Sequence, residues 1–357
     1  METIAYKCIN CGGPLEYNAA KQKFACEYCR SEFTEQQLKD HFGNLDEQLH
    51  EDVRSEEQSE EDKLYGTALF TCQSCGAEVI AETTNTAATF CVYCHSPVVL
   101  SNRLTGQFKP DKVIPFKISE QDAKDRFKKF CGKKIFLPKD FLSSAQLDMM
   151  KGVYYPYWLI DSDKDGGISG TGKKIRRWTE GDYEYKETKI YRVVREGKIK
   201  FTGYPHTALD DTNKKALKYV NPYDDEEFRP FTMAYLSGFM AEKRDLERNQ
   251  VQSEVDKELK DYAKKIYEDT VTDYDSYTTD NMHISTITEK WEYGLMPVWL
   301  MTFKYNGKDY LYAMNGQTGK NYGELPVSKG KLAAFGIGMF ILAAVIMFFI
   351  MGGASLL

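Results

Sequence analysis

The most uniformly apolar segment of the chain lies near its C-terminal end. Residues 332–352, LAAFGIGMFILAAVIMFFIMG, form a run of twenty-one residues without a charged side chain. As a helix, such a run crosses a hydrocarbon core of about 30 Å, whereas a buried helix of a soluble protein, which is the alternative, usually carries a polar stripe. The run therefore predicts one transmembrane helix. Lys329 and Lys331 precede it and no charged residue follows it, which predicts a cell-membrane anchor with a cytoplasmic N-terminal part.

Between residues 105 and 326, apolar residues recur with strand-like spacing in some segments and with helical spacing in others. Apolar residues alternate with polar ones at 183–204 and from His283 to Tyr312, which predicts strands. Helical spacing at 119–131 and 245–267 predicts two helices, each with one apolar face. The fold class is therefore α+β, with a mixed, β-rich central domain.

Two segments of this central domain are similar to each other. GVYYPYWL at 152–159 and GLMPVWL at 294–300 share a glycine and the pattern Pro-x-Trp-Leu, each followed by a polar strand. Similar segments at separate places in a chain indicate repeated supersecondary units. The match suggests an internal duplication.

Eight of the nine cysteines form two quartets near the start of the chain. Each quartet holds two Cys-x-x-Cys pairs, which are separated by fourteen residues in the first quartet and by fifteen in the second. A Cys-x-x-Cys turn places two thiolates on one edge of a tetrahedron, so two turns close a four-thiolate site around Zn²⁺. Redox dithiols and disulfides are the alternatives. The spacing predicts two structural zinc sites in two zinc ribbons, with the ligands Cys8, Cys11, Cys26, Cys29, Cys72, Cys75, Cys91 and Cys94.

An acidic segment separates the two quartets. Residues 34–63 contain eleven acidic and three basic residues, which is typical of a solvated linker or an exposed helix. The predicted organisation is a first zinc ribbon at 1–36, an acidic linker or helix at 37–66, a second zinc ribbon at 67–104, the α+β domain at 105–326 and the transmembrane helix at 332–352.

Charge argues against nucleic acid as the partner of the ribbons. The 357-residue chain has a net charge of -6, and residues 67–100 contain no Lys or Arg. Each four-thiolate zinc centre adds negative charge, whereas phosphate binding depends on Lys and Arg. The start of the chain, METIAYKCINCGG, has no secretory signal. We therefore expect cytosolic ribbons that bind protein.

Catalytic signatures are weak. Closed four-thiolate sites leave no coordination position for a substrate. The ninth cysteine, Cys131, is expected to be a buried or incidental thiol, because no base is evident near it in the sequence. No nucleophile, base and orienting group cluster in the sequence, so we expect a non-enzymatic protein, with a hydrolase or transferase as a minor alternative.

Two motifs resemble ligand-binding loops without completing them. AMNGQTGKNYG at 313–323 has Met314 and Asn321 where a phosphate-binding loop requires glycine and a hydroxyl residue, so it predicts a tight turn after a strand. DSDKDGGISGTG at 161–172 matches the first eight positions of a calcium loop but has Gly172 in place of the final glutamate. We interpret it as a turn at Asp-Gly-Gly between two strands, with calcium binding as the alternative.

One stretch is clearly basic. Residues 172–200 contain ten basic and five acidic residues. The simplest interpretation is an exposed face of an antiparallel sheet. Contact with anionic lipid is the next interpretation, because the chain is expected at a membrane, and nucleic-acid binding is the third.

The combination of motifs resembles a known protein family. The tandem CxxCG…CxYC ribbons, the PxWL segments, the MNGQTGKxxGxxP element and the terminal apolar helix are similar to bacterial membrane proteins called TFIIB-type zinc ribbon-containing. Some relatives carry the name of the primosomal helicase, replication factor Y. Others accompany phage-shock-like proteins and band-7 (SPFH) scaffold proteins in membrane-stress operons.

The resemblance implies an adaptor function. It implies that the chain ties a cytosolic scaffold protein, band-7/SPFH-like or phage-shock-like, to the membrane through its zinc ribbons. A helicase function is not expected, because the chain has no Walker A motif to hold Mg-ATP. The alternative function is a membrane-tethered nucleic-acid-binding or transcription regulator that uses residues 172–200.

Overall fold

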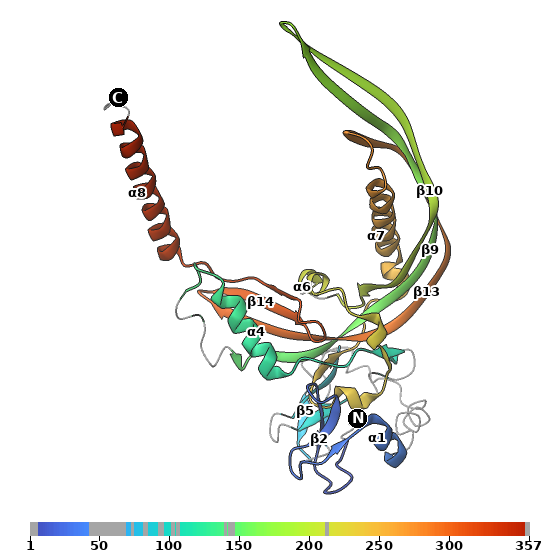
Figure 1. Cartoon of the computed structure of the whole chain (residues 1–357). Coiled ribbons are helices and arrows are strands. Elements are labelled where there is room, and N and C mark those ends of the chain that lie inside the picture. The colour runs from blue at the N-terminus through green and yellow to red at the C-terminus, as the bar shows by residue number, and fades with distance from the viewer. Residues whose placement is uncertain are drawn as a thin grey trace.

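The computed structural model shows a body from which a long curved arm and a C-terminal helix extend on the same side (Figure 1). The cysteine-bearing N-terminal part lies on the opposite side of the body. The structure describes residues 6–42, 69–72, 75–80, 85–91, 96–100, 104, 108–138, 141, 147–210 and 214–353.

The body and the arm share one mixed sheet of ten strands. Its path runs β11-β8-β13-β9-β12-β6-β7, while β10 pairs with β9, β14 with β13, and β15 with β14. This arrangement confirms the predicted mixed α+β class with a β-rich centre. The strands are β6 (Thr86–Phe90), β7 (Pro97–Val99), β8 (Lys112–Val113), β9 (Lys151–Glu180), β10 (Tyr183–Thr207), β11 (Arg229–Pro230), β12 (Met240–Glu242), β13 (Ser276–Tyr305), β14 (Lys308–Asn315) and β15 (Asn321–Gly323).

In the described residues four α-helices lie outside the first cysteine module, and three of them were predicted. Helix α4 (Glu120–Gly132) begins after Ser119, whose side chain accepts a hydrogen bond from the amide of Asp122. Helix α7 (Arg248–Asp269) begins with a capping box and buries one stripe of residues at helical spacing, as the 245–267 pattern predicts: Val251, Val255, Leu259, Ala263 and Tyr267. The other two are α6 (Lys214–Tyr219) and α8 (Lys329–Gly353).

The sheet contains two units with the same order of elements. The first is β8–α4–β9–β10 and the second is β12–α7–β13–β14. Strand β8 pairs in parallel with β13, and β12 pairs in parallel with β9, so each unit contributes a short strand to the other. The long strands β9 and β13 run antiparallel, with Pro156 opposite Leu295 and Tyr154 opposite Pro297. Each PxWL proline therefore lies opposite the residue two positions before the other proline. This register fits a local twofold axis between β9 and β13.

The two PxWL tryptophans have equivalent hydrogen bonds. Trp158 Nε1 donates to the carbonyl oxygen of Leu246, directly before the N-cap of α7, at 3.0 Å. Trp299 Nε1 donates to the carbonyl oxygen of Ile118, directly before the N-cap of α4, also at 3.0 Å. Each indole therefore holds the start of the other unit's helix.

The arm consists of β9, β10 and the first part of β13, with α7 on its concave side (Figure 1). Ala263 and Tyr267 of α7 pack on Ile168 of β9, and the hydroxyl of Tyr267 donates to the carbonyl oxygens of Gly166 and Gly197 at 3.0 and 2.7 Å. Beyond Lys173, where β13 begins, only the β9–β10 hairpin continues. The predicted strand at 183–204 is thereby confirmed.

The turn predicted within residues 161–172 is wrong, because β9 runs through the whole segment. A Cβ atom at Gly166 would lie 2.1 Å from the carbonyl oxygen of His283, and one at Gly167 would lie 2.2 Å from that of Arg195. The two glycines therefore permit close approach of the neighbouring strands rather than a reversal of the chain. A calcium loop must wrap around its ion, and a continuous extended strand does not.

The turn predicted at 313–323 is confirmed. Strand β14 ends at Asn315 and β15 returns antiparallel beside it. Asn315 Oδ1 accepts hydrogen bonds from the amides of Gln317 and Thr318, both at 2.9 Å, as an Asx turn requires.

The first cysteine module, residues 6–42, packs against the body. It contains β1 (Leu15–Asn18), β2 (Lys23–Cys26), β3 (Glu32–Phe33) and α1 (Glu35–Phe42). The ring of Tyr17 lies 5.2 Å from that of Tyr235, whose hydroxyl donates to Glu35 at 2.7 Å. Gln22 donates to the carbonyl oxygen of Phe116 at 2.7 Å. The module is thus one layer of the main core.

The second cysteine module, within residues 69–100, divides between two sheets. Strands β4 (Leu69–Thr71) and β5 (Glu78–Ile80) pair only with each other, whereas β6 and β7 belong to the ten-stranded sheet through β12. The sheet therefore continues across the predicted boundary at residue 104. Most of the predicted acidic linker, from residue 43 onward, lies outside the described residues.

Candidate functional site

The cysteines lie in turns with one backbone pattern. In the first turn the amide of Gly12 donates to the carbonyl oxygen of Cys8 at 2.8 Å, and the amide of Cys8 donates to that of Gly13 at 2.6 Å. The turn that begins at Cys26 has the same two bonds: the amide of Arg30 donates to the carbonyl oxygen of Cys26, and the amide of Cys26 donates to that of Ser31. In the turn that begins at Cys72, the amide of Gly76 donates to the carbonyl oxygen of Cys72, and the amide of Cys72 donates to that of Ala77.

A left-handed residue follows the second cysteine of these turns. Gly12, Arg30 and Gly76 have φ values of 74°, 61° and 75°. Glycine adopts this conformation readily, which explains the Cys-x-x-Cys-Gly pattern in the first pair of each quartet. The bend lets the two sulfurs of each turn approach each other.

The first quartet forms a compact thiol cluster. One sulfur from each of Cys8, Cys11, Cys26 and Cys29 lies within 4.8 Å of all the others. The Sγ atoms of Cys8 and Cys29 are 3.4 Å apart, and those of Cys11 and Cys26 are 3.5 Å apart. A tetrahedral Zn²⁺ with bonds of about 2.3 Å separates its sulfurs by about 3.8 Å. The cluster therefore fits a four-thiolate metal.

Two cysteines of this cluster are buried and two are exposed. Cys8 and Cys26 are buried, whereas Cys11 and Cys29 reach the surface. The hydroxyl of Ser31 lies 3.3 Å from Sγ of Cys29, and Ser31 lowers the pKa of that thiol to about 6. A thiolate is the form that binds metal, so these contacts favour the metal-binding form of Cys29.

Three of the four cysteines of the second quartet lie in the described part of the chain. Cys72, Cys75 and Cys91 bring their sulfurs within 4.8 Å of one another, with 3.7 Å between Cys75 and Cys91. Cys94, the predicted fourth ligand, lies outside the described residues. Two cysteine clusters are thus suited to metal ions.

Cys131 is separate from both clusters. Its side chain is 1% exposed in α4, and burial raises the pKa of its thiol to about 12. The prediction of a buried thiol is confirmed. At neutral pH it is protonated, so it is a poor nucleophile.

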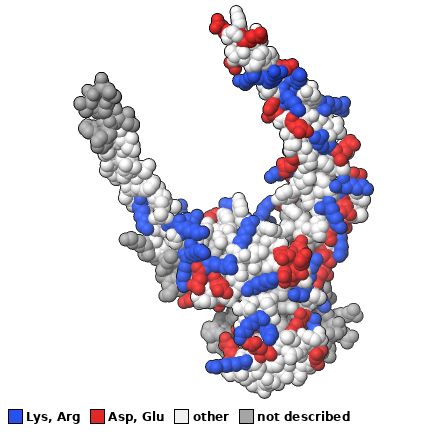
Figure 2. Space-filling view, viewed as in Figure 1, with Lys and Arg blue, Asp and Glu red and all other residues white. Residues whose placement is uncertain are grey.

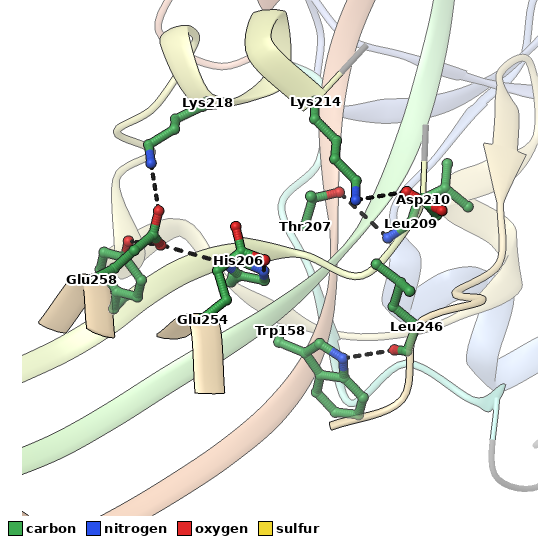
Figure 3. Close-up of polar contacts among 11 residues, drawn as sticks. Trp158, His206, Thr207, Leu209, Asp210, Lys214, Lys218, Leu246, Glu254 and Glu258 are labelled. Atoms are coloured by element: carbon green, nitrogen blue, oxygen red, sulfur yellow. Dashed lines mark hydrogen bonds and ion pairs between the residues drawn. The ribbon is translucent and has the colours of Figure 1, made fainter. Parts of the chain in front are cut away.

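A polar cluster that the sequence did not reveal lies between β10 and α7 (Figure 3). His206 Nδ1 lies 3.5 Å from a carboxylate oxygen of Glu258, and its Nε2 lies 3.9 Å from one of Glu254. Glu258 also accepts hydrogen bonds at 2.5 Å from Lys218 and from the hydroxyl of Tyr204. Although burial acts in the opposite direction, these bonds lower the pKa of Glu258.

The cluster forms one wall of a cavity of about 360 Å³ between α6, α7 and β10. Glu254 and Glu258 lie one turn apart on the predicted helix, which is the only hint in the sequence. Their meeting with His206 depends on long-range packing. Because Glu258 of α7 contacts His206 and Tyr204 of β10 and pairs with Lys218 of α6, we interpret the cluster as a contact that holds α7 against the base of the arm.

The stability of this contact is expected to depend on pH. Burial lowers the pKa of His206 below its usual value, although the nearby carboxylates act in the opposite direction. A histidine with a lower pKa in the folded state contributes fully above its unfolded pKa of about 6.5, and the contribution is lost as the pH falls through the folded pKa. We expect the melting temperature to fall from about pH 7.5 to about pH 5.5, and to fall less in His206→Gln. An equal fall in both proteins would contradict this assignment.

The basic stretch forms a hairpin whose strands face solvent. Residues 173–192 are exposed apart from a half-exposed Glu187, and they pair along the distal part of β9 and β10. Figure 2 shows Lys and Arg along the distal arm, with acidic side chains at its tip. The predicted exposed face of an antiparallel sheet is confirmed.

Helix α8 is apolar and exposed. Its segment Lys329–Met347 has a mean hydropathy of 2.0, and none of it is buried. Near its start it contacts the body, where Lys331 donates to the carbonyl oxygen of Leu137 at 2.6 Å and the rings of Phe335 and Phe136 lie 5.4 Å apart. By length and composition this helix could cross a membrane.

Comparisons with known proteins identify one relative. No protein-family model matches the chain, and no solved structure matches it. The chain is 30% identical over 336 residues to the uncharacterized protein YdjG of Bacillus subtilis (strain 168), and the alignment covers 94% of each protein. The chain therefore belongs to the same family as B. subtilis YdjG.

Proposed function

We propose that the chain is a non-enzymatic, zinc-stabilised adaptor that recruits a cytosolic scaffold protein to the cell membrane. The observation that carries this proposal is the placement of two features at opposite sides of the body: the thiol clusters on one side and the exposed apolar helix α8 on the other (Figure 1). Such a chain can hold a membrane and a soluble partner at the same time.

Zinc is the proposed metal, and the two cysteine modules are the proposed zinc ribbons. Sulfur separations of 3.4 to 3.7 Å, all-thiolate ligands and paired Cys-x-x-Cys turns together favour tetrahedral Zn²⁺. With four thiolates a site has no open position, so its metal would stabilise the module rather than catalyse a reaction.

Tyr28 marks the proposed docking surface on the first module. Its side chain is 77% exposed, although it lies between two proposed ligands, Cys26 and Cys29. The ring lies against Gly13, where an added Cβ would be only 2.9 Å from it, so the tyrosine packs on the turn. Rigid, exposed tyrosines are frequent anchors of protein interfaces.

Helix α8 is the proposed single-pass anchor, with the N-terminal part of the chain in the cytoplasm. Lys329 and Lys331 at its start favour that orientation. The resemblance described above supports a band-7/SPFH-like or phage-shock-like scaffold as partner and a role in membrane stress. The alternative, a membrane-tethered nucleic-acid regulator, is favoured only by the exposed basic hairpin of the arm.

Affinity purification of the whole chain distinguishes these functions. A fragment that ends at residue 104 would separate β6 from its partner β12, so the full chain is used. We expect it to retain a protein partner from detergent-solubilised membranes after nuclease treatment, and Tyr28→Ala to lower that retention about tenfold. Tyr183→Ala is the matched control, because Tyr183 is 72% exposed at the arm tip. Material that is released by nuclease would support the alternative instead.

A further inference from the structure

The basic residues of the arm lie on both faces of its sheet, in two distinct sets. Ile168 of β9 and Ile199 of β10 pack toward Ala263 and Tyr267 of α7, so even-numbered residues of β9 and odd-numbered residues of β10 face α7. Odd-numbered residues of β9 and even-numbered residues of β10 face away from α7. We call this second face of the distal arm the outer strip, formed by Lys173, Ile175, Arg177, Lys186, Ile190 and Arg192.

The outer strip combines basic and aliphatic side chains at close range. Lys173 lies opposite Ile190, and Arg177 lies opposite Lys186, in the strand register. Ile190 is 68% exposed. Between residues 169 and 177 of β9 and residues 186 and 194 of β10, this face carries no acidic side chain.

Acidic groups lie only at the margins of the outer strip. Asp280 of β13 accepts a hydrogen bond from the hydroxyl of Thr171 at 2.9 Å, and Asp275 accepts one from the amide of Ile175 at 2.5 Å. Glu184 follows at the tip. Among the described residues neither aspartate forms an ion pair with Lys173, Arg177, Lys186 or Arg192, so the four cations remain available to an anionic surface.

The aromatic side chains of the hairpin lie on the other face. Trp178 stacks on Tyr185 with ring centroids 5.4 Å apart and an interplanar angle of 11°, and Arg176 lies 5.5 Å from the Trp178 ring. Single-stranded nucleic acid needs aromatic platforms beside its phosphate contacts, and the outer strip has none. Cations around exposed aliphatic side chains instead suit lipid headgroups above an apolar layer.

We propose that the outer strip is a second membrane contact, which binds the headgroups of anionic lipids. This inference rests on the proposed anchoring by α8, because an anchored chain presents the strip to the surface at a high effective concentration. Each basic residue near an anionic surface then strengthens binding by about fivefold.

The position of α8 sets one geometric condition. The arm extends from the body at least as far as α8 does (Figure 1). Because α8 lies on the concave side of the arm and the strip on the other face, contact of the strip with the leaflet that α8 enters requires α8 and the arm to change their relative orientation. Between Lys329 and Met347 no side chain is buried, and the contacts with the body lie near Lys331 and Phe335, so little packing in this segment opposes such a change.

Vesicle binding with face-matched variants tests the proposal. Because no side chain of the Lys329–Met347 segment is buried, a chain ending at Ser328 keeps its core. It is mixed with neutral phosphatidylcholine vesicles or with vesicles that also contain phosphatidylglycerol. The test variant is Lys173→Ser, Arg177→Ser, Lys186→Ser and Arg192→Ser; the control removes the same charge from the face toward α7, as Lys174→Ser, Arg176→Ser, Lys189→Ser and Arg195→Ser.

We expect binding to the anionic vesicles only, a loss of at least about tenfold in the test variant, and a much smaller loss in the control variant. Equal melting temperatures confirm that all proteins are folded. Absence of binding to anionic vesicles, or equal losses in both variants, would overturn the proposal. Tighter binding of a short single-stranded DNA, lost in the test variant, would assign the strip to nucleic acid. Partner retention by the whole chain is measured separately, so failure here leaves the adaptor function standing.

Discussion

Purified chain is expected to contain one zinc ion for each of its two cysteine clusters. Cys8→Ser and Cys72→Ser should each lower the zinc content by about one ion per chain, because three thiolates hold the metal far less tightly than four. Binding of structural zinc contributes on the order of 10 kcal/mol to folding of isolated zinc fingers. The first module shares the main core through Tyr17 and Tyr235, so we expect Cys8→Ser to lower the melting temperature as well.

Cys131→Ala is the control for these changes, because Cys131 is a cysteine outside both clusters. It should leave the zinc content unchanged. Elemental analysis gives the metal content directly, and the absorption spectrum of the cobalt-substituted chain reports thiolate coordination. An unaltered chain with a single zinc ion, or with the absorption of an iron–sulfur cluster, would contradict the paired zinc sites.

Removal of α8 should convert a membrane protein into a soluble one. The full chain is expected to remain in membranes after a carbonate wash, and the chain ending at Ser328 is expected in the soluble fraction. The physical reason is the exposed apolar surface of α8, which a lipid environment covers favourably.

A full-length variant separates the effect of polarity from that of length. Ile341→Asp with Leu342→Asp places two charges in the middle of the helix, where each costs about 3 kcal/mol of insertion free energy. We expect it to be released by the carbonate wash. Retention of the shortened chain in washed membranes would show that another part of the protein anchors it.

Local patterns in the sequence predicted the elements that depend on local physics. Helices α4 and α7 follow from apolar spacing, and Ser119 marks the start of α4 as an N-cap residue does. The cysteine clusters follow from Cys-x-x-Cys spacing, because the turn geometry is set within six residues. The stripe of α7 then fixes which side of the helix packs against the arm.

Pairings between distant segments could not be predicted in the same way. Strands β6 and β7 have the composition of a small ribbon, yet they complete the central sheet through β12, more than 140 residues later. Gly166 and Gly167 are residues typical of a turn, yet they lie in β9. At these positions the neighbouring backbones leave no room for a Cβ, which explains the glycines. Both outcomes depend on which strand becomes the neighbour.

The predicted duplication gains support from the fold. The match of the two PxWL segments covers few residues, but Trp158 and Trp299 make equivalent hydrogen bonds and β9 pairs with β13 in a twofold register. The polar cluster around His206 had no such signal, since its three main members come from two elements whose contact the sequence does not encode locally.

The central claim is that one chain joins a cytosolic partner to the membrane, and the location of that partner tests it most directly. The protein retained by the whole chain is quantified in membrane and soluble fractions of cells that express the full chain, the chain ending at Ser328, or Cys8→Ser. We predict that the partner is in membranes with the full chain, in the soluble fraction but still bound with the shortened chain, and unbound with Cys8→Ser. The adaptor function would be contradicted by a partner that is in the membrane fraction with all three proteins, or in the soluble fraction with all three.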